Sequence, residues 1–160
     1  MKRTVINYLI IAAHSVSAAC KSNDPVGGKG LLKINGKEFS IISASICFKE
    51  IEGGTKPIRF ISFFNVYDQL LLSLIMNTKD EKLKAKTYTA SEIEILRIST
   101  HIVDGTTGGS YDYIDENAVM KVDMKGKTYN ITVTGLAIKD KYETEYTMTY
   151  EGGIEVIDCN

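Results

Sequence analysis

The stretch from residue 118 to residue 134 reads AVMKVDMKGKTYNITVT. Apolar side chains take every second position on both sides of a Lys-Gly-Lys turn at 125–127. They are Ala118, Met120, Val122 and Met124 before the turn and Tyr129, Ile131 and Val133 after it. Successive side chains of a strand point to opposite faces, so this period of two predicts an antiparallel hairpin with one buried face and one face in water.

The same pattern extends outward along the chain. Residues 144–150 alternate again, and an Asn-Gly pair at 35–36, the strongest short hairpin signal, precedes a long strand at 37–48. Two strongly apolar blocks, at 58–66 and 69–77, are typical of central core strands. We count about nine or ten strands and predict an all-β fold, an antiparallel meander forming either a β-sandwich or an up-and-down, lipocalin-like barrel.

The N-terminus has the features of an export signal. Lys2 and Arg3 precede a short apolar run of about 10 residues, where a membrane-spanning helix needs about 20. Small residues then lead into Cys20, and the segment resembles a lipobox, in which the cysteine is acylated. Ser17 stands where the usual box has Leu, Val or Ile, and relaxed boxes of this kind are typical of Bacteroides-type lipoproteins.

This reading divides the chain into three parts. We expect a signal peptide at 1–19, a lipidated Cys20 with a flexible tether at 20–30, and a single all-β domain at 31–160. Several acyl chains give stable anchoring, so we expect a protein anchored to the outer membrane that faces the cell surface or the periplasm. Loss of Lys2 and Arg3 changes the formal charge from −1 to −3, so no basic excess is present to attract nucleic acid.

Two cysteines remain after Cys20. An even pair in an oxidising compartment predicts a disulfide between Cys47 and Cys159. The alternative is that Cys47 is a small buried hydrophobe and Cys159 a free thiol in the tail.

The sequence carries no catalytic motif that we could identify. His14 belongs to the signal, which leaves His101 as the one histidine and excludes multi-histidine zinc sites. Nucleophile elbows, phosphate loops and dinucleotide fingerprints are absent. Carboxylates at a spacing of two, such as Glu143 and Glu145, are typical of a solvated strand face rather than a glycosidase pair. We therefore expect a protein that is not an enzyme and needs no cofactor.

The segment 104–117, DGTTGGSYDYIDEN, is the most promising functional region. It is long for a connection between strands, and long loops are often functional. Tyrosines beside acids suit a contact surface, whereas the spacing of the oxygen ligands matches no EF-hand, so we predict no metal. The candidate partner-binding residues are Asp104, Tyr111, Asp112, Tyr113, Asp115 and Glu116.

Several segments together resemble small Bacteroides-type lipoproteins of uncharacterised function. They are the relaxed lipobox, the polar tether, INGKEF at 34–39, GKTYNITVTG at 126–135 and YTMTY at 146–150. The resemblance implies the compartment and a lipocalin-like or sandwich β-domain, and it transfers no catalytic residue.

Three functions follow as hypotheses. The first is a non-enzymatic, lipid-anchored domain of the cell envelope that binds a protein or polymer outside the cytoplasm. The second is a lipocalin-like carrier of a small apolar ligand, with Tyr129, Tyr146 and Tyr150 lining its cavity. The third is an inhibitor or immunity lipoprotein that acts through the 104–117 loop.

Overall fold

The computed structural model describes residues 27–49, 58–65, 67, 69–76, 82–106, 108–139 and 142–158. The predicted signal peptide, Cys20, most of the tether and Cys159 lie outside these residues. Within the described part of the chain, no helix has the length and apolar character needed to cross a membrane.

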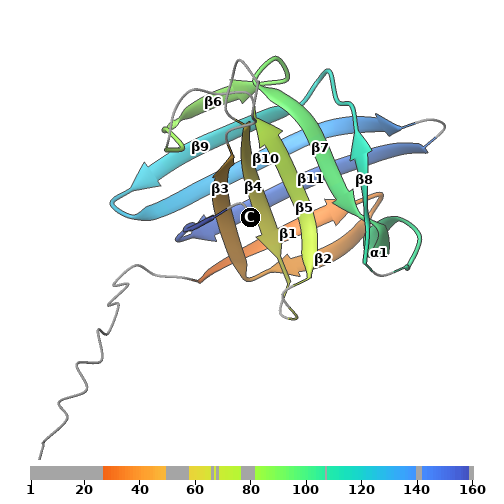
Figure 1. The fold of residues 1–160 in the computed structure, drawn as a ribbon, viewed down its shortest axis with the longest axis horizontal. Coiled ribbons are helices and arrows are strands. Elements are labelled where there is room, and N and C mark those ends of the chain that lie inside the picture. Colours follow the sequence, from red (N-terminus) through yellow and green to blue (C-terminus); the bar gives the residue numbers. More distant parts are fainter. Residues whose placement is uncertain are drawn as a thin grey trace, which may run out of the picture.

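Twelve strands in the described residues form two six-stranded sheets (Figure 1). Sheet A has the order β2-β1-β11-β10-β9-β6, and sheet B has the order β12-β3-β4-β5-β7-β8. The strands of sheet A are β1 (Gly28–Ile34), β2 (Lys37–Ile41), β6 (Lys86–Thr89), β9 (Val119–Lys125), β10 (Thr128–Lys139) and β11 (Tyr142–Gly152). Those of sheet B are β3 (Ser43–Lys49), β4 (Ile58–Phe64), β5 (Leu70–Met76), β7 (Ile93–Ser99), β8 (Ser110–Tyr113) and β12 (Glu155–Asp158).

The all-β prediction is confirmed, and of its two forms the structure has the sandwich. The sheets are stacked with their strands crossing at a steep angle and do not close into a barrel (Figure 1). The structure differs from a simple meander because four neighbouring pairs are not consecutive in the chain, namely β1–β11, β6–β9, β5–β7 and the parallel pair β3–β12. The strand number exceeds nine or ten because the predicted strand 37–48 is two strands, β2 and β3, in different sheets. In addition, β6, β8 and β12 have only four residues each, too few to show a clear period.

Both predicted hairpins are present. The stretch 118–134 contains β9 and the first half of β10, paired antiparallel from Thr128–Lys125 to Thr134–Val119. Its turn includes Gly126 at a φ of 62°, a left-handed conformation that glycine adopts without strain. Asn35 and Gly36 both have positive φ, as the two-residue turn joining β1 and β2 requires.

The core lies between the two sheets and is filled by large side chains. Phe63 and Tyr150 make an edge-to-face contact with ring centroids 5.7 Å apart. The rings of Tyr88, Tyr113 and Tyr146 are also buried. Of the three tyrosines expected to line a carrier cavity, Tyr146 and Tyr150 are buried in this core and Tyr129 is partly buried against it.

Backbone hydrogen bonds join the two sheets at two corners, where the chain passes from one sheet to the other. At the first, the Ile42 carbonyl accepts a hydrogen bond from Gly28 in sheet A, while its N–H donates to the carbonyl of Phe64 in sheet B. At the second, Ile114, which follows β8, forms a two-residue bridge with Ile138 of β10. This second corner contains part of the predicted functional loop.

Candidate functional site

The predicted loop 104–117 is only partly a loop. Residues 110–113 form β8, which pairs with β7 at the edge of sheet B. Asp112 lies opposite Arg97 in this pairing, and its two carboxylate oxygens accept hydrogen bonds of 2.6 and 3.2 Å from the Arg97 guanidinium. The Asp112 hydrogen bond raises the pKa of Arg97, which therefore stays charged. Asp112 thus ties β8 to the sheet.

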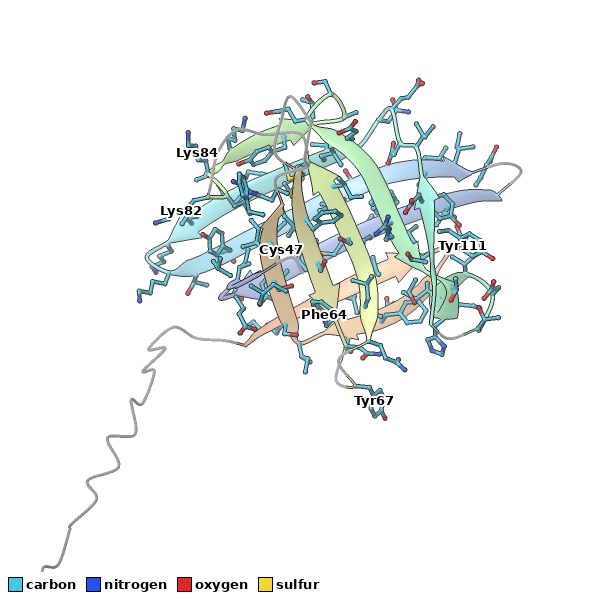
Figure 2. The ribbon with its side chains drawn as sticks, viewed as in Figure 1. Cys47, Phe64, Tyr67, Lys82, Lys84 and Tyr111 are labelled. Carbon is cyan, nitrogen blue, oxygen red and sulfur yellow. The ribbon has the colours of Figure 1, made fainter. Side chains whose placement is uncertain are left out.

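Asp104 holds the turn before β8 in place. Its Oδ1 accepts hydrogen bonds from the backbone N–H and the hydroxyl of Thr106, and its Oδ2 accepts one of 2.7 Å from the Tyr111 hydroxyl. The Thr106 hydrogen bonds, followed by that of Tyr111, lower the pKa of Asp104. Tyr111 lies beside the short helix α1 (Thr100–Val103), as Figure 2 shows. Both predicted contact residues already have partners within the turn.

Tyr113 is a core residue rather than a contact residue. Its side chain is 1% exposed and packs against the ring of Tyr111 with centroids 6.4 Å apart. The alternation of β8 explains the burial, because Tyr113 pairs with the buried Leu96 and faces the opposite sheet. Tyr113, which the sequence analysis predicted as a contact residue of a loop, is therefore a buried residue of a strand.

Asp115 is also buried, and its hydrogen bonds stabilise the second corner between the sheets. Its Oδ2 accepts a 2.8 Å hydrogen bond from the Tyr146 hydroxyl, and its Oδ1 accepts one of 2.8 Å from the backbone N–H of Asn117. Gly135 provides the space, since a Cβ there would lie 1.8 Å from Asp115 Oδ2. Burial, followed by the hydrogen bond and charge of Asp115, raises the pKa of Tyr146, so this phenol remains a donor.

Because Asp115 points inward, its neighbour Ile114 points outward. The Ile114 side chain is 68% exposed, although the backbone N–H and carbonyl of Ile114 both form hydrogen bonds with Ile138. Its N–H donates to the Ile138 carbonyl at 3.2 Å, and the Ile138 N–H donates back at 2.9 Å. Residues paired in this way in antiparallel strands have neighbouring side chains on one face, so Ile114 and Ile138 lie together.

Two further aliphatic residues extend this surface. Leu136 lies on the outer face of β10 together with Ile138. Val119 of β9 is on the same face of the sheet, because it pairs with Thr134, two residues before Leu136. All four aliphatic side chains are between 40% and 68% exposed. We call this surface the corner patch; it consists of Ile114, Val119, Leu136 and Ile138.

Acidic side chains border the corner patch. In the register of β10 with β11, Glu143 lies opposite Ile138 and Glu145 lies opposite Leu136. Glu116, a predicted contact residue that is exposed, follows Asp115 at the corner. The patch is therefore apolar at its centre and negatively charged along one side.

The sequence analysis named none of the four patch residues as a contact residue, although Ile114 lies within the predicted segment 104–117. A signal for two of them was present: along β10 the buried positions 131 and 133 are followed in the same phase by Gly135 and Ala137, which are small. The large residues Leu136 and Ile138 then fall on the outer face. A reversal of this kind, with small residues inside and large ones outside, marks an exposed apolar surface.

Cys47 is disulfide-bonded. Ile157 of β12 lies opposite Cys47 in β3, two residues before Cys159. Since Cys159 lies outside the described residues, its pairing with Cys47 stays a prediction.

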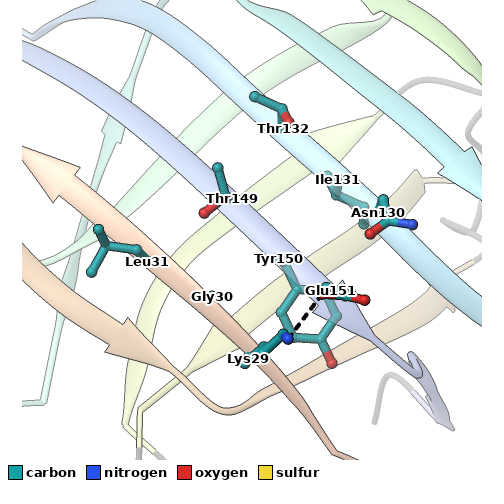
Figure 3. A pocket seen from close by; sticks show the side chains of 9 residues that line it. All are labelled: Lys29, Gly30, Leu31, Asn130, Ile131, Thr132, Thr149, Tyr150 and Glu151. Carbon is teal, nitrogen blue, oxygen red and sulfur yellow. Dashed lines mark ion pairs between the residues drawn. The ribbon is translucent and has the colours of Figure 1, made fainter.

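Two surface hollows lie among other residues. His101 of α1 is exposed and lines a hollow of about 350 Å³ with Gln69, Ser99 and Ser110. A second hollow, of about 340 Å³, lies on the outer face of sheet A and is crossed by the Lys29–Glu151 ion pair (Figure 3). Within the described part of the chain, neither contains a cluster of three metal-ligating side chains.

Comparison with models of protein families, with curated proteins and with solved structures finds no match for this chain.

Proposed function

We propose that this protein is a non-enzymatic, lipid-anchored domain of the cell envelope that binds a partner protein through the corner patch. The observation that carries the proposal is the grouping of four exposed aliphatic side chains at a corner fastened by the buried Asp115. Single exposed apolar residues are normal on a protein surface, whereas a contiguous group marks an interaction site.

The chemistry of the corner patch favours a protein partner over a polysaccharide. All four side chains are aliphatic, so they offer no aromatic ring on which a sugar could stack. Branched aliphatic side chains on a sheet lose little freedom on binding, which favours packing against an apolar protein surface. The partner that fits carries apolar side chains with basic groups placed opposite Glu116, Glu143 and Glu145.

The position of the patch suits an anchored protein. Gly28, where the described domain begins, pairs with Gly152 at one end of β11, while the patch lies beside Glu143 at the other end. Nine residues of strand separate the two ends, or about 30 Å at the rise of an extended chain. An anchor at Cys20 would thus leave the patch on the far end of the domain, directed away from the membrane.

The inhibitor hypothesis is less well supported by this geometry. It requires a protruding wedge at 104–117, but Asp104, Tyr111 and Asp112 are bonded to residues of their own hairpin, and Tyr113 and Asp115 are buried. A partner enzyme that is inhibited would have to meet the corner patch instead.

Site-specific photo-crosslinking in the source cells tests the proposal. A photoreactive phenylalanine analogue at position 138 of the full-length chain is expected to capture one defined protein, and the matched control is the same analogue at position 132 on the same face of β10. Adding Ile114→Asp should abolish the product at 138. Equal capture from both positions, or capture that survives Ile114→Asp, would contradict the proposal.

A further inference from the structure

At the end of β10 away from the corner patch, apolar side chains of the inner face of sheet A are accessible. The β9–β10 hairpin extends past β3, near the edge of sheet B, at the left in Figure 1. Met124 belongs by alternation to the inner face, with the buried Met120 and Val122, yet its side chain is 42% exposed. Tyr129, which lies opposite Met124 in the hairpin, is also only partly buried. Apolar side chains that face the core in the rest of the sheet are therefore accessible here.

These side chains form the floor of a cleft of about 300 Å³ between the two sheets. Other apolar residues form its walls, namely Ile46, Leu83, Ile154 and Val156. The backbone at Gly126 and Gly153 completes the lining without adding side chains. A cleft of this volume and apolar lining lies at the lower end of the range for small-molecule sites.

Among the described residues that line this cleft, both charged side chains are positive. Lys82 and Lys127 line it and are exposed, and no aspartate or glutamate is among the described residues that line it. Lys82 precedes Leu83, whose side chain is 3% exposed, so the two residues place a cation beside the apolar interior (Figure 2 labels Lys82). An apolar cleft with a cationic rim is complementary to a molecule with one apolar chain and one anionic head.

We propose that this cleft binds a single-chain carboxylate amphiphile such as a fatty acid. The alkyl chain packs against Met124, Leu83 and Ile154, and the carboxylate lies near Lys82 and Lys127 at the rim. Met124 is suited to this role because an unbranched thioether adapts to the shape of a flexible chain. The cleft and the corner patch lie at opposite ends of β10, so this binding is independent of the proposed partner protein.

A fluorescent fatty acid tests the proposal directly. The full-length chain with Cys20→Ser, which removes competing detergent and anchor lipid, is titrated with dansylated undecanoate, and palmitate is added as competitor. We expect enhanced dansyl fluorescence that palmitate reverses.

Met124→Glu should weaken binding about tenfold or more, because it places a carboxylate in the apolar floor. Leu31→Glu is the matched control, since Leu31 is an apolar residue of the same sheet with 38% exposure but lies on the outer face.

A second pair of variants tests the head group. Lys82→Glu should weaken palmitate binding, whereas Lys37→Glu, an exposed lysine of β2, should change it less than about twofold. Hexadecanol, which has the chain without the charge, should compete poorly. Absence of probe binding, equal effects of Met124→Glu and Leu31→Glu, or equal competition by hexadecanol would overturn the proposal. Binding only to phosphatidylglycerol vesicles would overturn it too, because it would indicate a membrane surface site.

Discussion

Asp115 is the residue on which the candidate site depends most. Among the described side chains only two charged ones are buried, Arg59 and Asp115. Arg59 lies over the ring of Phe48, with its guanidinium carbon 5.7 Å from the ring centroid. Asp115 instead accepts hydrogen bonds from Tyr146 and Asn117 in the space left by Gly135, and this arrangement turns Ile114 outward. Its removal should therefore affect both stability and the corner patch.

We expect Asp115→Ala to lower the free energy of unfolding by about 1–3 kcal/mol, because it leaves the Tyr146 hydroxyl and the Asn117 N–H without their acceptor. Urea denaturation measures the change. Asp123→Ala is the control: this exposed residue pairs with Lys121 on the outer face, and its loss should cost less than about 0.5 kcal/mol. Similar losses for both variants would show that the buried carboxylate has no special role.

The raised pKa of Tyr146 predicts a loss of stability in alkali. A phenol whose pKa is higher in the folded than in the unfolded state holds its proton more tightly when folded. Its contribution is complete below the ordinary tyrosine pKa of about 10 and is lost as the pH rises above it. Burial raises the pKa of Tyr150 in the same direction, so we expect both phenols to ionise late.

Unfolding by urea at about pH 8 and about pH 11 should show this decline, and Tyr146→Phe should reduce its slope. Absorbance of phenolate in the folded protein, recorded over the same range, provides an independent measurement. If Tyr146→Phe has the same pH dependence as the parent chain, Tyr146 does not contribute to it.

At the scale of elements, β10 connects the two candidate sites. Its inner face changes from large residues to Gly135 and Ala137, and this change moves Leu136 and Ile138 into the corner patch. Its other end carries Tyr129 into the cleft. The wall of that cleft depends on β12, a four-residue edge strand that pairs only with β3. A four-residue strand has few backbone hydrogen bonds, so we expect the disulfide of Cys47 in the neighbouring strand β3 to contribute to stability.

We expect Cys159→Ser to remove the disulfide of Cys47 and to lower the free energy of unfolding by about 2–4 kcal/mol, the usual effect of losing a native bridge. Intact mass before and after reduction, together with thiol titration in denaturant, shows whether Cys47 has become free. Reduction of the parent chain should reproduce the loss of stability. A Cys47 that stays oxidised in Cys159→Ser would mean that its partner is another cysteine.

At the scale of the whole molecule, the first described residues and the cleft lie toward one end of the domain, and the corner patch lies at the other. The first described residues lie at one end of β11, the corner patch lies at the other, and the cleft opens between the sheets at the end of the β9–β10 hairpin (Figure 1). This arrangement fits the proposal that the domain is anchored at one end and binds a partner at the other.

The anchor itself is a prediction from residues 17–20, and Cys20→Ser tests it. We expect the parent chain in the membrane fraction and the variant in the soluble fraction, because acyl chains attached to Cys20 would supply the membrane affinity. Labelling with radioactive palmitate should mark only the parent. Ser22→Ala, a neighbouring change in the predicted tether, is the control. A variant that still sediments with membranes would contradict lipid anchoring at Cys20.

The sequence by itself determined the local features of this protein. The period of two at 118–134 determined the β9–β10 hairpin and its buried face, and Asn35-Gly36 determined the turn between β1 and β2. Both are properties of neighbouring residues, because strand alternation and turn conformation depend on backbone geometry within a few positions. The all-β class followed from the same local patterns.

Only the tertiary structure decided which faces are covered. Tyr113 and Asp115 look like contact residues in the sequence but are buried, whereas Met124 looks like a core residue but is accessible. The reason is physical: burial depends on which strand of the other sheet lies above a residue. That arrangement comes from contacts between distant segments, such as the bridge of Ile114 with Ile138 and the pairing of β1 with β11, and no local pattern records them.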